Sequence, residues 1–413
     1  MRHLWVVLHR WAGLFLALFL AIEGLTGAVL AFREDLDVFA APTLHRVAPP
    51  HAGAATLDPL DLRRAVLRQF PGGTIDYLPL HAVRGRTVVL DIERVDPATG
   101  ARSRWSRDWD ELFVDPYTGR IVGYRLWGDI RQGTVNLVPF VYRIHQSLAL
   151  DGTGLLFLGI VALVWAVDCF IGFYLTLPMR QARRISPARP QKNWQARWRA
   201  AWGVRWGSGA HKRTFDLHRA VGLWIWPLLL IFAWSAVSFN LAPVYRPIMG
   251  MFGYEALETG VTPPALPRYA PRIGFEMAVK TGERLAREAA ARFAFTIDPA
   301  RETGLLHRPD AGIYAYIFST SADMRQTGGR SIVIFDSDTG RLVKTVMPQG
   351  QNGANSFHEW ITALHMADVW GLAYRFAVSL FGLLLASLAV TGTLLWHRRR
   401  SARRASRRRD GGS

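Results

Sequence analysis

The sequence Leu8-His9-Arg10-Trp11-Ala12-Gly13-Leu14 stands where the first apolar stretch of the chain begins. Its counterpart, Leu217-His218-Arg219-Ala220-Val221-Gly222-Leu223, stands where the third begins. Each places a histidine four residues before a glycine, so on a helix the two residues lie on one face. The shared spacing indicates an internal repeat, in which glycine removes a side chain that would block the edge of a planar group bound at the histidine.

A second pair of histidines follows the same repeat. His145 precedes Gly172 by 27 residues, and His365 precedes Gly392 by 27. The distance between His145 and His365 is 220 residues, close to the 209 that separate the first pair. The histidines therefore form two matched pairs.

Hydrophobic residues make up 50% of the sequence and are concentrated in four stretches. These are Trp11 to Phe32, Leu155 to Leu177, Ala220 to Leu241 and Phe376 to Trp396. About 20 apolar residues span a bilayer core, and only helices and closed barrels satisfy their own backbone there. The first stretch is too long for the apolar part of a signal peptide and no small-residue cleavage site follows closely. We therefore expect four transmembrane helices.

The net charge of +18 is confined largely to two regions of the sequence. One is the link between the second and third apolar stretches, and the other is the tail from Arg398 onward. The cations of the link are Arg180, Arg183, Arg184, Arg189, Lys192, Arg197, Arg199, Arg205, Lys212 and Arg213. The positive-inside bias places both regions, and both termini, in the cytoplasm. Retention at an anionic leaflet accounts for these clusters, so we favour a lipid partner over a nucleic-acid-binding tail.

The histidine pairs predict two haem sites in this arrangement. His9 and His218 lie near the cytoplasmic face, while His145 and His365 lie near the periplasmic face. Two imidazoles at each face are the ligands of two six-coordinate haems, and so predict an electron path across the bilayer. The single cysteine, Cys169, allows neither an internal disulfide nor a Cys-x-x-Cys-His attachment, so the haems would be of b type.

Other interpretations of the histidines remain open. Histidines at an interface can simply contact lipid headgroups. His358, His397 and His211 are alternative ligands, with His358 the strongest of the three, although neither His358 nor His211 has a counterpart in the other half. A straight helix from His145 to Pro178 would be roughly 50 Å long, which exceeds the bilayer core. The outer haem would then sit high, or the helices would tilt.

Two acids, Glu23 and Asp168, lie inside apolar stretches and have Phe232 and Leu388 as counterparts. Because burial of an acid in a membrane is costly, a functional role is the default hypothesis. They could carry a proton or bind a quinol headgroup, whereas the structural alternative is a hydrogen bond between helices.

Several tryptophans suggest surfaces. Trp194, Trp198, Trp202 and Trp206 recur every four residues among arginines, which predicts a helix in the inner headgroup layer, with electron-donor docking as an alternative. On the outer side, His358, Trp360 and Trp370 cluster before the fourth stretch and are candidate substrate contacts.

The connections between the stretches also repeat. Phe113-Val114-Asp115-Pro116-Tyr117-Thr118-Gly119-Arg120 resembles Ile334-Phe335-Asp336-Ser337-Asp338-Thr339-Gly340-Arg341, and both predict strand, turn and strand. Helices are expected at 60–69 and 276–293, and strands at 87–95 and 313–319. The fold class is thus an α-helical membrane protein with α+β external domains, built as two parallel repeats of helix, external domain and helix.

These patterns divide the chain into successive segments. The first helix ends at 32, the first external domain covers 33–140, and the second helix with its periplasmic extension covers 141–178. A basic, Trp-rich cytoplasmic loop covers 179–217 and the third helix 218–241. The second external domain covers 242–357, the fourth helix with its extension 358–397, and the basic tail 398–413.

The sequence lacks Gly-x-Gly-x-x-Gly after a strand, a Walker loop, Gly-x-Ser-x-Gly and His-Glu-x-x-His. Without a nicotinamide or flavin domain, the chain would receive electrons from a quinol or a cytoplasmic reductase. It would be one relay in an electron path.

The Leu-His-Arg-x-x-Gly-Leu helix, the Val-Asp-Pro-Tyr-Thr-Gly-Arg turn and the return helix headed by histidine resemble the PepSY-associated transmembrane proteins, from about Leu8 to Arg400. The resemblance implies a bacterial inner-membrane reductase with two haems that reduces a ferric siderophore, or another ferric chelate, and releases iron in the periplasm. It also implies a non-enzymatic alternative, in which the external domains bind or regulate extracytoplasmic proteins or peptidases.

Overall fold

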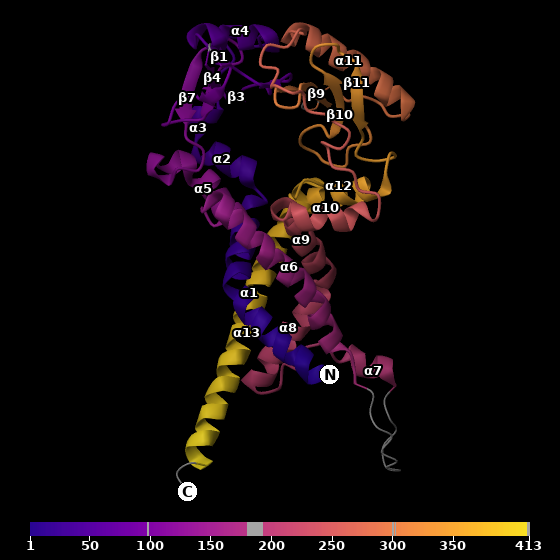
Figure 1. Cartoon of the computed structure of the whole chain (residues 1–413). Helices are drawn as coiled ribbons and strands as arrows, with labels where there is room; N and C mark the ends of the chain where they lie inside the picture. The colour runs from indigo at the N-terminus through magenta and orange to yellow at the C-terminus, as the bar shows by residue number, and fades with distance from the viewer. Residues whose placement is uncertain (97–98, 180–192, 300, 302, 411–413) are drawn as a thin grey trace. The chain divides into compact units, whose positions relative to one another are not determined.

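The computed structural model describes the whole chain except residues 97–98, 180–192, 300, 302 and 411–413. At residues 402–410 it describes the backbone but not the side chains. The basic residues expected to mark the cytoplasmic side at 180–192, and the side chains of the basic tail from 402 onward, therefore lie outside the described residues. Two compact units are present: a helical unit of 1–31, 143–245 and 372–413, and an α+β unit of 32–142 and 246–371 (Figure 1).

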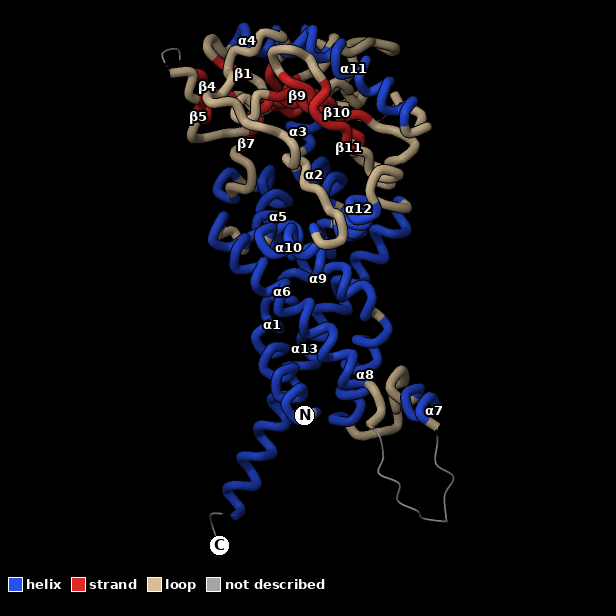
Figure 2. Tube along the Cα trace, turned by 45° about the vertical axis from the view of Figure 1, so that its right-hand side comes forward, coloured by secondary structure: helices blue, strands red, loops and turns tan. Residues whose placement is uncertain are grey.

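The helical unit contains the candidate membrane spans. Three helices are long and apolar enough to cross a bilayer: α1 (Arg2–Leu30), α6 (Asp151–Thr176) and, up to Ser401, α13 (Gly371–Asp410). A fourth span is formed if α8 (Ala210–Trp224) and α9 (Trp226–Asn240) are counted together. Among the described residues the chain thus has three or four candidate spans, as the bundle in Figure 2 shows.

The third apolar stretch is bent where a straight helix was expected. The axes of α8 and α9 meet at 67°, with Ile225 between them. Pro227 lies in the first turn of α9 and has no N–H to donate to the preceding turn. The expected continuous helix over 218–241 is therefore two helices.

The periplasmic extensions expected for the second and fourth helices are separate helices. Helix α5 (Leu137–Ser147) ends before α6 begins, and Leu148 and Ala149 have positive φ values of 52° and 57°. Helix α12 (Gly353–His365) ends before α13, with Ala367 and Trp370 at φ 54° and 52°. The expected 50 Å straight helix after His145 is therefore wrong, because a left-handed backbone conformation ends a helix.

The helices of this unit pack closely where small residues meet. A Cβ added to Gly24 of α1 would lie 2.5 Å from the carbonyl oxygen of Gly382 in α13. Near this contact, the Ser379 hydroxyl donates a 2.7 Å hydrogen bond to the carbonyl of Ala28. Close approach through small residues and hydroxyl hydrogen bonds is a common way for helices to associate in membranes.

The α+β unit contains three antiparallel sheets, with strand orders β1-β4-β5, β3-β6-β7 and β11-β10-β9-β8-β2. The strands are β1 (Gly73–Thr74), β2 (Tyr77–Pro79), β3 (Val88–Leu90), β4 (Glu93–Val95), β5 (Arg102–Arg104), β6 (Glu111–Val114), β7 (Ile121–Arg125), β8 (Gly304–Arg308), β9 (Ile313–Phe318), β10 (Ser331–Asp336) and β11 (Leu342–Val346). Its helices include α2 (Arg33–Ala40), α3 (Pro42–His45), α4 (Pro59–Gln69), α10 (Ala242–Gly250, which begins in the helical unit) and α11 (Phe275–Arg292). Both expected helices and the expected strand at 313–319 are present, whereas the strand expected at 87–95 is two short strands, β3 and β4, in different sheets.

One sheet joins the two connections. Strand β2 comes from the first connection and pairs with β8 of the second. His307 of β8 is buried at this junction, where its backbone N–H donates to the Asp76 carbonyl and Asp76 pairs with Arg102. Burial, with Arg102 and Arg63 nearby, lowers the pKa of His307 to about 4, so its imidazole is neutral at neutral pH.

The repeated hairpins have the predicted form. Gly119 and Gly340 have φ values of 72° and 70°. The predicted turn needs a positive φ at this position, and glycine adopts it most readily. Their N–H groups donate to the carbonyls of Asp115 and Asp336, each at 2.9 Å. The Thr118 hydroxyl donates to the Asp115 carboxylate, and the second hairpin repeats this bond.

Candidate functional site

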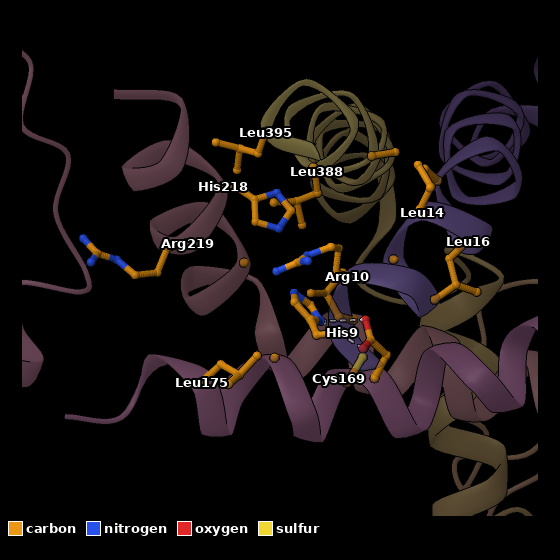
Figure 3. Close-up of a pocket in the computed structure, with 18 of the residues that line it drawn as sticks. His9, Arg10, Leu14, Leu16, Cys169, Leu175, His218, Arg219, Leu388 and Leu395 are labelled. Carbon is orange, nitrogen blue, oxygen red and sulfur yellow. Dashed lines mark hydrogen bonds and ion pairs between the residues drawn. The ribbon is translucent and has the colours of Figure 1, made fainter. Parts of the chain in front are cut away.

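A cavity of about 450 Å³ lies within the helical unit, between α1, α6, α8, α9 and α13 (Figure 3). Its volume is in the range of small-molecule and cofactor sites, about 300–1,000 Å³. Most of its wall is apolar, including Leu14, Leu16, Trp165, Leu385, Leu388 and Leu395. The first pair of histidines supplies its polar groups, together with Asp168 and several arginines.

The structure brings His9 and His218 together in this cavity. The centres of their rings lie 6.4 Å apart, and the ring planes are tilted by 54°. An imidazole nitrogen lies about 2.0–2.1 Å from a first-row metal ion and about 1.1 Å from its own ring centre, so two imidazoles on opposite sides of one ion have centres roughly 6.3 Å apart. The observed separation therefore matches a pair of axial ligands.

His9 is oriented by an acid. Its Nδ1 lies 2.9 Å and 3.0 Å from the two carboxylate oxygens of Asp168, which is itself buried on α6. Within the described residues the Nε2 of His9 has no hydrogen-bond partner. A proton on Nδ1 donated to the carboxylate leaves the lone pair of Nε2 for a metal, the arrangement common around metal-ligating histidines.

His218 is oriented by a hydroxyl. Its Nδ1 lies 3.0 Å from the Thr391 Oγ1 of α13. Because this hydroxyl donates to the carbonyl of Ser387 at 2.8 Å, it accepts from the imidazole. The Nδ1 of His218 thus carries the proton and its Nε2 the lone pair.

Glycines make room for both imidazoles. A Cβ added to Gly172 would lie 3.3 Å from Cε1 of His9, and one added to Gly392 would lie 3.2 Å from Cε1 of His218. Gly13 and Gly222, singled out from their spacing, also line the cavity, and a Cβ on Gly13 would meet no atom within 4 Å. The first two glycines therefore seat the rings, while the other two leave the cavity open.

Four arginines line the same cavity. Arg2 donates to the carbonyls of Leu175 and Leu177, and Arg219 pairs with Asp216. For Arg10 and Arg399, the described part of the chain holds no ion-pair partner. Figure 3 shows Arg10 pointing toward the space that the two imidazoles share. Unpaired guanidinium groups beside an apolar cavity favour a ligand with carboxylates.

His145 has a similar environment elsewhere in the helical unit. It lies on α5, where its Nδ1 is 2.9 Å from the Thr26 hydroxyl and 3.1 Å from a carboxylate oxygen of Glu23. A Cβ on Gly27 would lie 3.2 Å from its Cε1. The other carboxylate oxygen of Glu23 is buried without a hydrogen-bond partner among the described residues.

The remaining histidines are not brought to the cavity. His365 lies at the end of α12 in the α+β unit. His358, on the same helix, has its ring centre 5.0 Å from that of Tyr254, and burial lowers its pKa. His211 and His397 are exposed and do not line the cavity. Trp360 and Trp370 lie together, with ring centres 6.1 Å apart.

The sequence indicated the histidines but not what holds them. Asp168 and Glu23 were expected to act in proton transfer, quinol binding or helix contacts, yet each bonds to a histidine of the first half. Thr26 and Thr391 were missed because a hydroxyl in an apolar helix has no distinctive spacing. Their signal was available in principle, since Thr391 directly precedes Gly392 and Thr26 directly precedes Gly27.

Comparison with known families agrees with this architecture. No curated protein matches the chain. The family model described as PepSY-associated TM region matches residues 6–399, which include all the helices and strands described above except the ends of α1 and α13. The apolar helices agree with a multi-pass membrane protein. The chain therefore belongs to the PepSY-associated TM region family.

Proposed function

We propose that the chain is a di-haem b reductase of the bacterial inner membrane that passes electrons outward to a ferric siderophore. The observation that carries the proposal is the pair of imidazoles in one cavity, 6.4 Å apart, with each Nδ1 bonded to an acceptor. A metal-free hydrogen-bonding role would not require both rings to line one cavity with each Nε2 left without a hydrogen-bond partner among the described residues.

The donor set and the space around it fit a haem. A bis-histidine haem supplies one-electron transfer. Asp168 and Thr391 hold the imidazoles in the required tautomer, and the apolar wall excludes water. Arg10 and Arg399 have guanidinium groups to offer the two carboxylates of a haem.

The second haem is proposed at His145 and His365. Support comes from the environment of His145, which repeats that of His9: a buried acid at Nδ1 and a glycine against the ring. In the second half, Ser235 stands at the position equivalent to Thr26, 209 residues later. The register that pairs His9 with His218 thus also pairs the hydroxyl residue beside His145 with one in the second half.

The substrate is proposed to be iron held by hard oxygen ligands. Such ligands favour Fe(III) over Fe(II), so one electron given to the chelate loosens its hold on the metal. The electron comes from a quinol or a cytoplasmic reductase, since the sequence has no nicotinamide- or flavin-binding motif. His358, Trp360 and Trp370 are the proposed chelate contacts.

Absorption spectroscopy of the purified protein tests the proposal. We expect a Soret band and a sharp α-band on reduction, and faster reoxidation by a ferric siderophore than by buffer. The gallium(III) complex of the same siderophore is the matched control, because it binds alike but accepts no electron. Reoxidation at the buffer rate would remove the reductase function. A colourless protein from haem-sufficient cells would favour the alternative, a membrane protein that binds or regulates extracytoplasmic proteins or peptidases.

The proposed orientation rests on the positive-inside bias of the sequence. A reporter that functions only outside the cytoplasm should be active when fused after Gly119 or Gly340, in the repeated hairpins. Activity of a cytoplasmic reporter at either position would reverse the direction proposed for electron flow.

A further inference from the structure

A row of aromatic contacts leads from the protein surface to the wall of the cavity. Trp194 lies on α7 (Trp194–Arg199), and its ring centre is 5.5 Å from that of Trp198. Trp198 is 6.1 Å from Phe173, which in turn is 4.8 Å from Trp226. Phe173 and Trp226 both line the cavity that holds His9 and His218. Trp198 therefore packs directly against Phe173, a residue of the cavity wall.

Hydrogen bonds fix these rings in place. The indole N–H of Trp198 donates to the hydroxyl of Thr176 at 3.3 Å. Trp202, 5.5 Å from Trp198, accepts through its carbonyl from the indole of Trp224 at 3.1 Å. Three of the tryptophans expected on a helix in the headgroup layer, Trp194, Trp198 and Trp202, thus pack on one another and on the helical unit. The helix ends at Arg199, so Trp206, which is 66% exposed, lies beyond it.

Ion pairs to Asp216 hold the same segment in place. Arg205 binds both carboxylate oxygens of Asp216 at 2.6 Å, and Arg219 binds the same carboxylate at 3.0 Å. Asp216 is fully buried, and it is the only acid in residues 179–217 of the sequence. The other cations of this segment therefore have no acidic neighbour within it.

The exposed face of α7 combines aromatic rings with cations. Trp194 is 44% exposed and Arg199 is exposed, while Arg197 is half-buried and its guanidinium donates to the Met179 carbonyl at 3.0 Å. Tryptophan and arginine are the residues that most often dominate binding energy at protein interfaces. A cationic face attracts an acidic partner and speeds its association. A headgroup anchor would need the same residue types, but it would not need a row of rings that reaches the cavity.

We propose that the surface of α7 around the exposed Trp194 and Arg199, with the half-buried Arg197 and Trp198 beside them, is the docking surface of a small acidic redox protein that donates electrons to this chain. The inference rests on the proposed haem in the cavity. The donor loses one electron and the ferric haem gains it, with no bond made or broken. Packed rings carry the electron better than a gap of solvent or lipid, so the Trp198–Phe173 contact is the preferred route.

The charge part of the proposal is tested by binding. The full-length protein, with and without haem, is placed in phosphatidylcholine nanodiscs, and its affinity for a flavodoxin, used as the acidic one-electron probe, is measured against salt. We expect the double variant Arg197→Gln, Arg199→Gln to bind about tenfold more weakly at low salt, because charge complementarity is lost. The control is Lys212→Gln with Arg213→Gln, an equal charge change on exposed residues of α8. Equal affinities for the two double variants would overturn the docking surface.

The aromatic part is tested by the rate of haem reduction. Reduction is measured at saturating flavodoxin, so that a change in affinity does not enter the rate. Trp198→Leu should then slow reduction, while Trp198→Phe should retain most of the rate. Trp206→Leu is the matched control, since Trp206 is 66% exposed and lies in the same segment without a place in the row of rings. Equal rates for the two leucine variants would overturn the route.

These outcomes separate the inference from the function on which it rests. If the protein holds no haem, the proposed function fails, while binding of flavodoxin to the haem-free chain still reports on the surface. The variants are also compared in nanodiscs that contain phosphatidylglycerol. If flavodoxin affinity differs between the α7 variants and the unmodified protein only in these anionic nanodiscs, the face binds lipid and the inference is wrong.

Discussion

The two halves of the chain seat their histidines in the same way but orient them differently. His9 faces Gly172 and His218 faces Gly392, and a Cβ added to each glycine would lie 3.3 Å and 3.2 Å from the Cε1 of the facing ring. The Nδ1 of His9 meets a carboxylate, whereas that of His218 meets the hydroxyl of Thr391. Leu388 occupies the position equivalent to Asp168, 220 residues later. The steric part of the repeat has been kept and the polar part has diverged.

This difference follows from what each contact demands. A ring packed against a helix leaves little room for a side chain at the point of contact, so glycine is favoured there. The Nδ1–H needs an acceptor, and either a carboxylate or a hydroxyl provides one. A carboxylate makes the imidazole a stronger electron donor to a metal than a hydroxyl does. The two ligands of one iron would therefore be unequal.

The largest expected effect comes from removing a proposed ligand. His9→Ala or His218→Ala should abolish the haem of the cavity, and His145→Ala or His365→Ala the other, because a six-coordinate haem depends on both axial bonds. Each variant should keep about one haem per chain, measured by pyridine haemochrome assay against protein concentration.

The exposed histidines are the control for this pattern. His211→Ala and His397→Ala should retain both haems, since neither residue lines the cavity. Loss of both haems from every single variant, or of none from any, would contradict the two-site assignment.

The seat of each ring is the next test of the comparison. Gly172→Val and Gly392→Val should each reduce haem occupancy severely, because even a Cβ stands within 3.3 Å of an imidazole carbon. The Soret absorbance per chain is the measurement. Gly152→Val is the control, since a Cβ there meets no atom within 4 Å. Equal occupancy in all three variants would show that the rings move freely.

Much of this arrangement could be predicted from the sequence because it is repeated. The fixed spacing of His9 and His218 from their glycines predicted two rings on corresponding helix faces, and the structure places them in one cavity. The repeated Thr-Gly-Arg turns were predicted by residue chemistry, since Gly119 and Gly340 occupy positive φ. A pattern that occurs twice at the same spacing rarely arises by chance.

What the sequence did not show involves contacts without a repeated or local signal. Asp168 has no acidic counterpart, so its bond to His9 could not be found by register. The helix ends at Leu148 and Ala149 use positive φ without glycine, which no composition marks. The bend before α9 did have a signal in the sequence, because Pro227 within an apolar stretch cannot donate a backbone hydrogen bond to the preceding turn.

A smaller effect should distinguish the two orienting groups. Asp168→Asn removes a negative charge beside His9 and should raise the midpoint potential of the cavity haem, since the ferric state loses more stabilisation than the ferrous state. The shift should be of the order of a tenfold change in the redox equilibrium, ~59 mV for one electron. Thr391→Val removes only a dipole and should shift the potential less.

Spectroelectrochemical titration of both variants provides the measurement. Haem content has to stay near one per site in each, so that a change in potential is not a change in occupancy. Equal shifts in the two variants would mean that the carboxylate and the hydroxyl act alike, and the asymmetry between the halves would then be structural only.

The smallest effect is expected in the repeated hairpins of the α+β unit, where the halves differ only in what faces the turn. Alanine in the left-handed region costs about 1 kcal/mol, so Gly119→Ala and Gly340→Ala should both loosen their turns. The new Cβ at 119 would lie 3.0 Å from the Cβ of Ala65, which cannot rotate away. At 340 it would lie 3.2 Å from the Cδ1 of Ile273, the far end of a flexible side chain. Hydrogen exchange of the amide at 340 should therefore accelerate by about fivefold, and that of the amide at 119 by more. The control is Gly274→Ala, where an added Cβ meets no atom within 4 Å and exchange should not change. Equal acceleration at 119 and 340 would show that backbone strain alone, and not the facing side chain, decides the cost.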